Sequence, residues 1–233
     1  MFRDVSERRK IERSQRLAQM GKMAADMAHE VKNQLMIINT RAQIAELRKP
    51  ENPELAADLK TIRNQCNRVN DIVKRLLMFS KPGKGDFVQA DVNETVDAVI
   101  RLVEKQYAMN GVTLQRDFGS GIPPVLMDIK QMQDVFLNLI GNAYEAMPEG
   151  GEIIVHTGTN SDRVQVLIAD TGTGISESDL EHIFDPFFTT KEDGTGLGLS
   201  VCYGVIQAHD GDLRYTSEPG NGTTATVTLP VSQ

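Results

Sequence analysis

The chain has 233 residues, of which 25 are Lys or Arg and 32 are Asp or Glu, so its formal net charge is −7. This acidic balance argues against general nucleic-acid binding, which needs a basic surface to displace counterions from phosphates. No apolar run approaches the roughly 20 residues of a membrane span, and the N-terminus lacks an apolar signal core. We therefore expect a soluble cytoplasmic segment that makes no membrane contact. Cys66 and Cys202 show no metal-ligand spacing and are expected to be buried thiols.

Residues 15–80 carry apolar side chains at heptad spacing, interrupted by a Pro-containing segment at 49–53. This pattern predicts two helices that form an antiparallel hairpin. Two helices cannot shield both of their apolar seams, so pairing of two hairpins into a dimeric four-helix bundle is the economical arrangement and predicts a homodimer. The alternative is a monomeric hairpin packed on the second half of the chain. The stripe comprises Leu17, Met20, Ala24, Met27, Val31, Gln34, Ile38, Ala42, Ala45, Leu55, Leu59, Ile62, Cys66, Val69, Val73 and Leu76.

A stretch rich in Lys, Gly and Pro at 81–86 cannot continue a helix and is predicted to be a hinge. Residues 87–233 then mix strand and helix patterns. Strands are expected at 87–90, 112–117, 124–127, 151–158, 163–170, 211–217 and 223–229, and helices at 91–109, 129–147 and 196–209. This order predicts an α/β sandwich with helices on one face of a mixed sheet, and an α+β chain as a whole.

His29 is placed by the heptad on the solvent-facing side of the first helix. Such a histidine is usually an ordinary surface residue. Here Glu30 is its neighbour, and Asn33 lies one turn further along the same face. Glu30 could accept a proton from an imidazole that attacks an electrophile, and Asn33 could orient water toward a group attached to His29. An exposed nucleophile on a helix suits a substrate that another protein domain delivers.

The stretch 27–33, MAHEVKN, resembles the H box of two-component sensor histidine kinases. In that family the histidine is autophosphorylated, and the phosphoryl group passes to an Asp of a response regulator. The resemblance implies that His29 is the phosphoacceptor, Glu30 the base, and Asn33 a support for dephosphorylation of the regulator. Gln34 stands where the family usually has Pro, so we expect a straighter helix here.

A polar face on the expected helix 129–147 combines Asp134, Asn138, Asn142 and Glu145. A solvated helix face is the alternative, but paired Asn residues are unusual there because amides are middling helix formers. Their carbonyl oxygens are suitable Mg²⁺ ligands beside a nucleotide phosphate. The segment resembles the family's N box, which implies that Asn142 is the metal ligand, with Asn138 assisting. Glu145 is a secondary candidate for a role as a base or beside the metal.

Asp170 ends an apolar strand and begins the sequence Asp-Thr-Gly-Thr-Gly, which includes Gly172 and Gly174. A simple turn would give the same pattern. The segment resembles the G1 box, in which the Asp accepts a hydrogen bond from the adenine amine and the glycines let the backbone approach the base.

Two more segments follow in the family's order. Residues 184–191 resemble the F box, an aromatic lid that ends in Lys191, the basic side chain expected at the β- and γ-phosphates. Residues 194–199 resemble the G2 box and open a helix whose free N–H groups could bind phosphate; a glycine run alone is weak evidence. The expected contacts in G2 are Thr195, Gly196, Leu197 and Gly198, and a weaker G3 box includes Thr223.

The resemblance covers residues 15–230 and implies a kinase that uses ATP and Mg²⁺, forms a homodimer and acts on a response regulator. Its expected domains are a linker at 1–14, the phosphotransfer hairpin at 15–80, the hinge at 81–86 and the ATP-binding domain at 87–233. Residues 2–10 resemble the end of a PAS sensor domain, although a charged helix start is the alternative. ATP-hydrolysing relatives of this fold carry Glu where this chain has Asn138. Two rival functions remain: a free ATPase of the same fold, and a regulator-binding scaffold or phosphatase with degenerate kinase activity.

Overall fold

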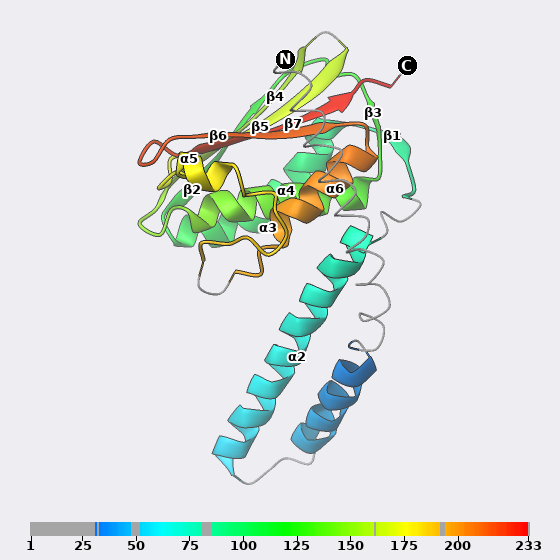
Figure 1. Cartoon of the computed structure of the whole chain (residues 1–233), viewed down its shortest axis with the longest axis vertical. Coiled ribbons are helices and arrows are strands. Elements are labelled where there is room, and N and C mark those ends of the chain that lie inside the picture. The colour runs from blue at the N-terminus through cyan, green and yellow to red at the C-terminus, as the bar shows by residue number, and fades with distance from the viewer. Residues whose placement is uncertain are drawn as a thin grey trace. The chain divides into compact units, whose positions relative to one another are not determined.

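The computed structural model describes Val31 and residues 33–47, 52–80, 85–160, 162–191 and 194–232. The chain divides into two compact units, residues 1–83 and 84–233. The described residues of the first unit are mainly helical, and those of the second combine a sheet with helices (Figure 1).

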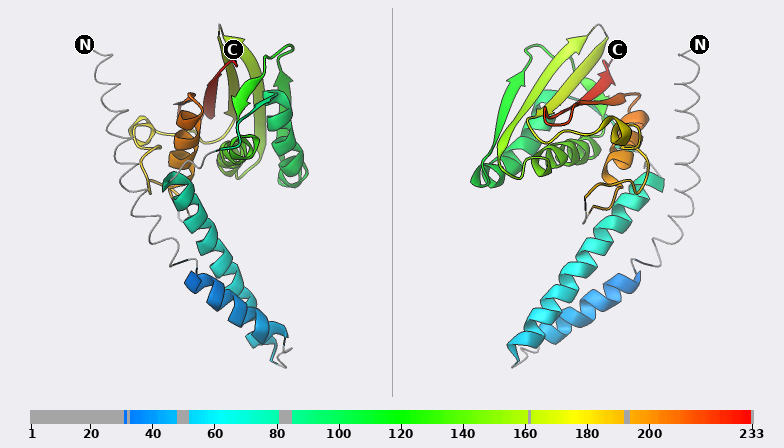
Figure 2. Two further views of the ribbon diagram at one scale, coloured as in Figure 1. Left: turned by 90° about the vertical axis from the view of Figure 1, so that its right-hand side faces the viewer. Right: turned by 60° about the vertical axis from the view of Figure 1, so that its left-hand side comes forward.

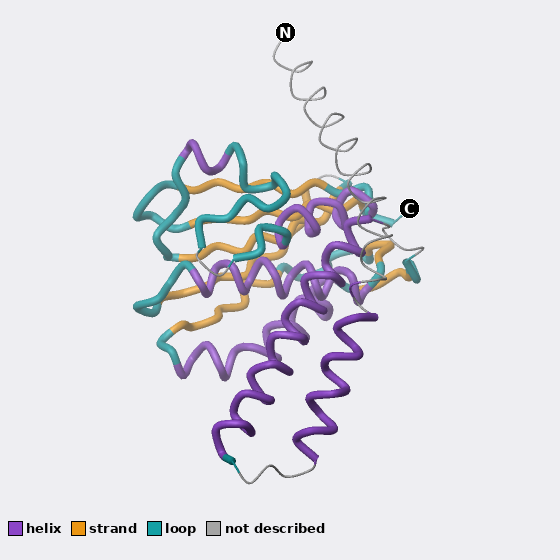
Figure 3. Tube along the Cα trace, turned by 60° about the horizontal axis from the view of Figure 1, so that its bottom comes forward, coloured by secondary structure: helices purple, strands orange, loops and turns teal. Residues whose placement is uncertain are grey.

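The described part of the first unit is a helical hairpin. One helix covers residues 33–47, and α2 covers Pro53–Ser80. Asn52 caps α2, because its side-chain Oδ1 accepts a hydrogen bond 2.9 Å long from the N–H of Glu54. The two helices lie side by side in every view (Figure 3). Arg63 on α2 forms an ion pair with Glu46 on the other helix, and Asn39 Nδ2 donates to Asn67 Oδ1 across 3.4 Å.

The predicted apolar stripe contains both buried and exposed side chains. Ala42, Leu59 and Cys66 are buried within the hairpin. Other members of the same stripe stay exposed, with fractions of 37–48%; these are Val31, Ile38, Leu55, Ile62 and Val69. A single hairpin therefore covers only part of its own apolar surface, as expected for two helices alone.

The second unit is built on a five-stranded mixed sheet in the order β2-β4-β5-β7-β6. β2 and β4 are parallel, and the other neighbours are antiparallel. The strands are β2 (Val112–Phe118), β4 (Gly151–Asn160), β5 (Arg163–Asp170), β6 (Asp212–Ser217) and β7 (Thr223–Pro230). A separate antiparallel pair joins β1 (Val88–Ala90) to β3 (Val125–Met127).

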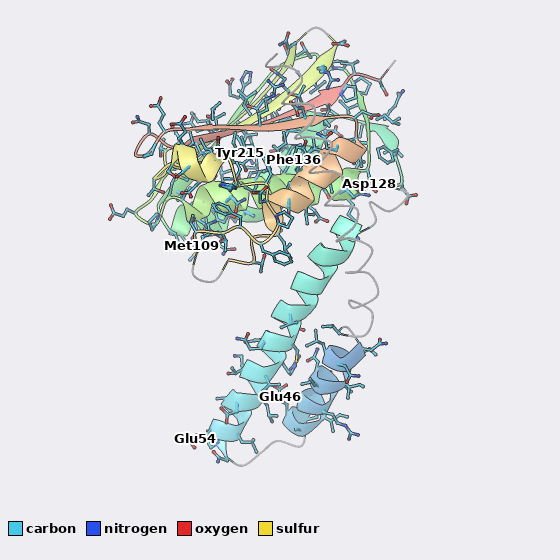
Figure 4. All side chains as sticks on the ribbon, viewed as in Figure 1. Glu46, Glu54, Met109, Asp128, Phe136 and Tyr215 are labelled. Carbon is cyan, nitrogen blue, oxygen red and sulfur yellow. The ribbon has the colours of Figure 1, made fainter. Side chains whose placement is uncertain are left out.

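Three helices cover one face of this sheet: α3 (Val92–Met109), α4 (Ile129–Glu145) and α6 (Gly198–Ala208) (Figures 1 and 2). Strand residues alternate accordingly. In β7, every second side chain is buried against the helices, and the residues between them are half-buried on the other face. Phe136 of α4 is fully buried between helix and sheet, whereas Met109 at the end of α3 is 87% exposed (Figure 4).

The predicted fold, helices followed by an α/β sandwich, is confirmed. Two features of the structure were not predicted. A one-turn helix, α5 (Glu177–Leu180), is present, and β1 and β3 form a sheet of their own, apart from the main sheet. The buried residues of α4 are Met132, Val135, Phe136, Leu139, Ile140 and Ala143, whereas Ile129 at its start is 38% exposed.

Candidate functional site

The polar face of α4 forms a connected cluster with the loop that precedes α6. Asn142 Nδ2 donates a hydrogen bond to Asn138 Oδ1 across 3.2 Å. Lys191 Nζ donates to Asn142 Oδ1 across 3.4 Å and forms an ion pair with Glu145. The structure thus brings together four residues that the sequence analysis singled out, and it places two amides and a cation within reach of one another.

Gly198 is the point where α6 meets this cluster. A Cβ atom at position 198 would lie 2.7 Å from Asn138 Nδ2 and 2.9 Å from Asn138 Oδ1. Such separations are shorter than van der Waals contact, so only glycine lets the first turn of α6 approach the Asn138 amide this closely. The N-terminus of α6 is a place where free backbone N–H groups favour anions.

Asp170 lies at the end of β5, and its Oδ1 accepts two backbone hydrogen bonds. The Gly172 N–H donates across 2.8 Å, and the Thr223 N–H donates across 3.2 Å. Burial raises the pKa of Asp170 above its ordinary 3.8, and these two hydrogen bonds offset only part of that effect. Both bonds are to Oδ1, and within the described ranges no donor is recorded on Oδ2.

The Gly-rich turn after Asp170 packs against the end of α4. The Thr173 N–H donates to Ala146 O across 3.1 Å, and a Cβ at Gly172 would lie 2.7 Å from that same oxygen. Gly174 has φ +72°, and a Cβ there would lie 2.2 Å from Glu218 O. The turn therefore needs glycine to bring Asp170 close to α4, and it is more than a generic loop.

The predicted lid begins with Phe184 and runs into the glycine segment before α6. Phe187 is 56% exposed and has φ +67°, a left-handed conformation that is unfavourable for a bulky side chain. Its N–H donates to Gly196 O across 3.0 Å, and Gly196 itself has φ +65°. A Cβ at Gly196 would lie 2.3 Å from the carbonyl carbon of Phe187, so glycine is needed where the backbones of these two residues pack against each other.

The remaining predicted nucleotide contacts occupy different surroundings. Thr195 Oγ1 accepts from the Leu197 N–H across 3.5 Å. Leu197 is 1% exposed, so its side chain belongs to the core and only its backbone could meet a ligand. Thr223 is buried and shares a 2.9 Å hydrogen bond with Ser217 Oγ.

Sequence reasoning missed two side chains beside this site, Tyr215 and Ser217. Ser217 Oγ accepts from the Ile175 N–H across 2.8 Å and donates to Gly222 O across 2.8 Å, so it ties together the two turns that flank Asp170. Tyr215 packs edge-on against Phe184. Both side chains lie on the inward side of β6, together with Leu213. A polar group at an inward position of a strand was the sequence signal that could have identified them.

Of the phosphotransfer residues, His29 and Glu30 lie outside the described residues. Asn33 lies on the helix over 33–47 and is exposed. Within the described ranges, no group of three or more His, Cys, Asp or Glu side chains could hold a metal ion.

Two family models match the chain in the order of its two units. Residues 19–85 match the His Kinase A (phospho-acceptor) domain, and residues 127–233 match the histidine kinase-, DNA gyrase B- and HSP90-like ATPases. The crystal structure of the catalytic domain of histidine kinase ThkA is 31% identical, with a TM-score of 0.58, and the match covers 62% of this chain and 95% of that one. The chain belongs to the two-component sensor histidine kinases.

Similar full-length proteins carry names of the same kind. Sporulation kinase E of Bacillus subtilis (strain 168) is 34% identical over 238 residues, and the signal transduction histidine-protein kinase AtoS of Escherichia coli (strain K12) is 34% identical over 237 residues. Each match covers 100% of the kinase described here but only 32% and 39% of those relatives. A structure of ThkA in complex with response regulator protein TrrA is 28% identical, with a TM-score of 0.66, and covers 97% of this chain and 66% of that one.

No helix in the described part of this kinase has the length and apolar character needed to cross a membrane.

Proposed function

We propose that this chain transfers the γ-phosphoryl group of ATP to His29 and then to an aspartate of a response regulator. The observation that carries the proposal is the cluster of Asn138, Asn142 and Lys191 close to Asp170, within a unit that matches the ATPase family. The second support is the match of residues 19–85 to a phospho-acceptor domain, which contains the H-box residue His29.

The site's chemistry suits an adenine nucleotide. Asp170 has one carboxylate oxygen saturated by backbone N–H groups, and its Oδ2 would accept from the exocyclic amine of adenine. Gly196 and Gly198, with Thr195, would place backbone and hydroxyl donors at the phosphates, where the N-terminus of α6 favours negative charge. Lys191 would exchange its pairing with Glu145 for the phosphate oxygens.

The amide cluster on α4 suits a hard divalent cation. Asn142 would hold Mg²⁺ through Oδ1, with Asn138 fixing the orientation of its amide. When bound, Mg²⁺ neutralises charge on the β- and γ-phosphates and favours loss of ADP.

In the transfer, one imidazole nitrogen of His29 forms a bond to the γ-phosphorus while the bond from that phosphorus to the β–γ bridging oxygen breaks. Glu30 accepts the imidazole proton, and ADP leaves. We infer that residues 81–86 act as the hinge that lets the ATP-binding domain, residues 87–233, reach the hairpin at 15–80. Asn138 stands where hydrolytic relatives have Glu, so an amide replaces the base that activates water in those relatives, and His29 would remain the favoured acceptor.

The hairpin would act as a homodimer. Its exposed apolar stripe, which includes Ile38, Leu55 and Ile62, would be covered by a second hairpin in a four-helix bundle. A response regulator would dock beside His29, as the ThkA–TrrA complex supports for that relative. The exposed amide of Asn33 would orient water for the reverse reaction, dephosphorylation of the regulator. We place this activity in the cytoplasm, where ATP and response regulators occur.

The proposal is tested by incubating the purified chain with γ-labelled ATP and Mg²⁺. We expect a covalent label that acid removes and alkali does not, as for phosphohistidine. The variant His29→Gln should lose the label entirely and bind ATP with unchanged affinity. A label that survives His29→Gln would contradict the phosphoacceptor assignment. Steady ATP turnover in His29→Gln would favour the free ATPase, and a failure of the wild type to bind ATP would favour the regulator-binding phosphatase.

A further inference from the structure

The last two residues of the predicted hinge are attached to the start of α4. The Asp86 N–H donates to Asp128 Oδ2 across 3.2 Å. A Cβ at Gly85 would lie 3.0 Å from that same oxygen and 3.0 Å from Gln131 Nε2, so the backbone at position 85 lies directly against the first turn of the helix. Of the hinge predicted at 81–86, these are the two residues that the structure describes, and both lie against Asp128.

Asp128, which Figure 4 labels, is the N-cap of α4 and uses both of its carboxylate oxygens. Oδ1 accepts from the Gln131 N–H across 3.0 Å, which is the capping hydrogen bond. Oδ2 accepts from Gln131 Nε2 across 3.0 Å and from the Asp86 N–H. Because the cap needs only one oxygen, the second is available to hold the end of the hinge. A serine at this position would keep the cap and lose the contact with the hinge.

A buried histidine holds the backbone of Asp128 from the other side. His209, the C-cap of α6, is 2% exposed, and its Nε2 accepts from the Asp128 N–H across 3.0 Å. Its Nδ1 donates to Val205 O across 2.8 Å, so both ring nitrogens have partners. The ring of Phe87, the residue after the hinge, lies against the imidazole with the two centroids 4.6 Å apart. The end of the hinge is thus attached to α4 through Asp128, and Phe87 packs on the end of α6.

The same two helices carry proposed nucleotide contacts farther along their length. Asn142 lies about four turns, or about 20 Å, along α4 from Asp128. Gly198 begins α6, and His209 follows its last residue. A hinge end that is held by Asp128 and His209 therefore has a fixed position relative to the proposed site for Mg²⁺ and phosphate.

We propose that Asp128 is a positioning residue for phosphoryl transfer to His29, because its Oδ2 fixes the point at which the hinge joins the ATP-binding domain. The inference rests on the proposed transfer from ATP to His29 and on the proposed hinge. The length of a linker sets the effective concentration at which the groups it joins meet. Without the Oδ2 contact, Gly85 and Asp86 would lengthen the linker, and the γ-phosphate would reach His29 over a wider range of positions and orientations. Loss of the contact should slow the transfer and leave nucleotide binding intact.

Two simpler roles for Asp128 predict other results. If Asp128 only capped α4, serine would replace it fully, since both residues are good N-caps. If Asp128 supported the fold of the nucleotide site, its loss would lower the nucleotide affinity together with the rate of transfer. A positioning role lowers the rate at saturating ATP while the affinity stays constant.

The experiment compares the wild type with Asp128→Ser in the full chain. It measures the initial rate of acid-labile labelling at saturating γ-labelled ATP with Mg²⁺, and the affinity for the non-hydrolysable nucleotide AMPPNP. We expect the rate to fall at least about 3-fold and the affinity to be unchanged. Asp91→Ser is the matched control, because Asp91 caps α3 in the same way, through a 2.7 Å hydrogen bond from the Asn93 N–H. Both measurements should stay at their wild-type values in Asp91→Ser.

Gly85→Ala tests the same contact from the side of the hinge. The new Cβ would lie 3.0 Å from Asp128 Oδ2 and 2.9 Å from Phe87 Cε2, so it should push the hinge end away from the cap without changing α4. We expect a rate similar to that of Asp128→Ser. The double variant should be no slower than either single variant, because both changes remove one and the same contact.

Four outcomes would overturn the inference alone. These are a wild-type rate in Asp128→Ser, a fall in AMPPNP affinity that matches the fall in rate, an equal slowing in Asp91→Ser, and additive losses in the double variant. If instead the wild type bound AMPPNP but formed no phosphohistidine, the proposed transfer to His29 would itself be contradicted.

Discussion

Burial of the Asp170 carboxyl group has a stability cost that its proposed role in adenine binding would explain. Burial raises its pKa in the folded chain above the ordinary 3.8, so the folded state binds the proton more tightly than the unfolded state does. The free energy of unfolding therefore decreases as pH rises through the window just above 3.8. The Oδ2 atom of the same carboxyl group is the acceptor that we propose for the adenine amine.

The substitution Asp170→Asn should separate these two effects. The amide keeps an acceptor for the N–H groups of Gly172 and Thr223 but carries no charge to desolvate. We expect the thermal midpoint of the nucleotide-free variant to gain on the wild type as pH rises from about 4 to 7, and adenine nucleotide binding to be lost. Thermal melts across this range and an ATP titration measure both.

Asp97 provides a control of opposite sign for that experiment. A hydrogen bond from Arg116 lowers the pKa of Asp97, so its contribution to stability is present above the unfolded pKa and is lost as pH falls through the folded pKa. Asp97→Asn should thus lose stability relative to the wild type as pH rises, without any effect on nucleotide affinity. If Asp170→Asn and Asp97→Asn changed the pH profile in the same direction, the assignment of Asp170 would be contradicted.

Helix α6 begins at the proposed phosphate-binding part of the site and packs against the core, and it contains two glycines, Gly198 and Gly204. Gly198→Ala replaces glycine by a better helix former, yet its Cβ would lie 2.7 Å from Asn138 Nδ2 and displace that amide. We expect unchanged or higher stability with nucleotide affinity at least about 10-fold lower, equivalent to roughly one lost hydrogen bond.

Gly204 is the matched control within the same helix. A Cβ there would meet nothing within 4 Å, so Gly204→Ala should stabilise the chain by up to about 1 kcal/mol and leave nucleotide affinity unchanged. Denaturant unfolding and an ATP titration of both variants complete the comparison. Equal affinities for the two variants would show that the contact between α6 and Asn138 has no part in binding.

The elements were predictable from the sequence because local patterns encode them. Alternation along β4 and β5 and the helical spacing of Met132, Phe136 and Leu139 place strands and helices within a few residues of their observed ends. The sheet order was not predictable, because β7 lies between β5 and β6 through contacts far apart in the sequence. The same is true of Tyr215, whose ring packs on Phe184, a residue of a different segment of the chain.

The described residues of the two units differ in how completely they bury their apolar side chains. Residues 84–233 bury large side chains such as Phe136 and Ile206 completely. The hairpin instead leaves Ile38, Leu55 and Ile62 between 43% and 48% exposed on one stripe. Full burial of an exposed side chain of this kind contributes about 1.5–3 kcal/mol, so covering the part of each that is still exposed would contribute roughly half of that per residue.

This asymmetry predicts that Ile62→Asp dissociates the homodimer without harming the nucleotide site. A charge at position 62 would have to be buried in the bundle core, once from each subunit, and should raise the dimer dissociation constant at least about 100-fold. Asn64→Asp adds the same charge two residues on, on the opposite and exposed side of α2, and should remain a dimer. Sedimentation at micromolar concentration distinguishes the variants. A wild type that sediments as a monomer would contradict the four-helix bundle. A loss of ATP affinity in Ile62→Asp would show that the ATP-binding unit depends on the hairpin for its own stability.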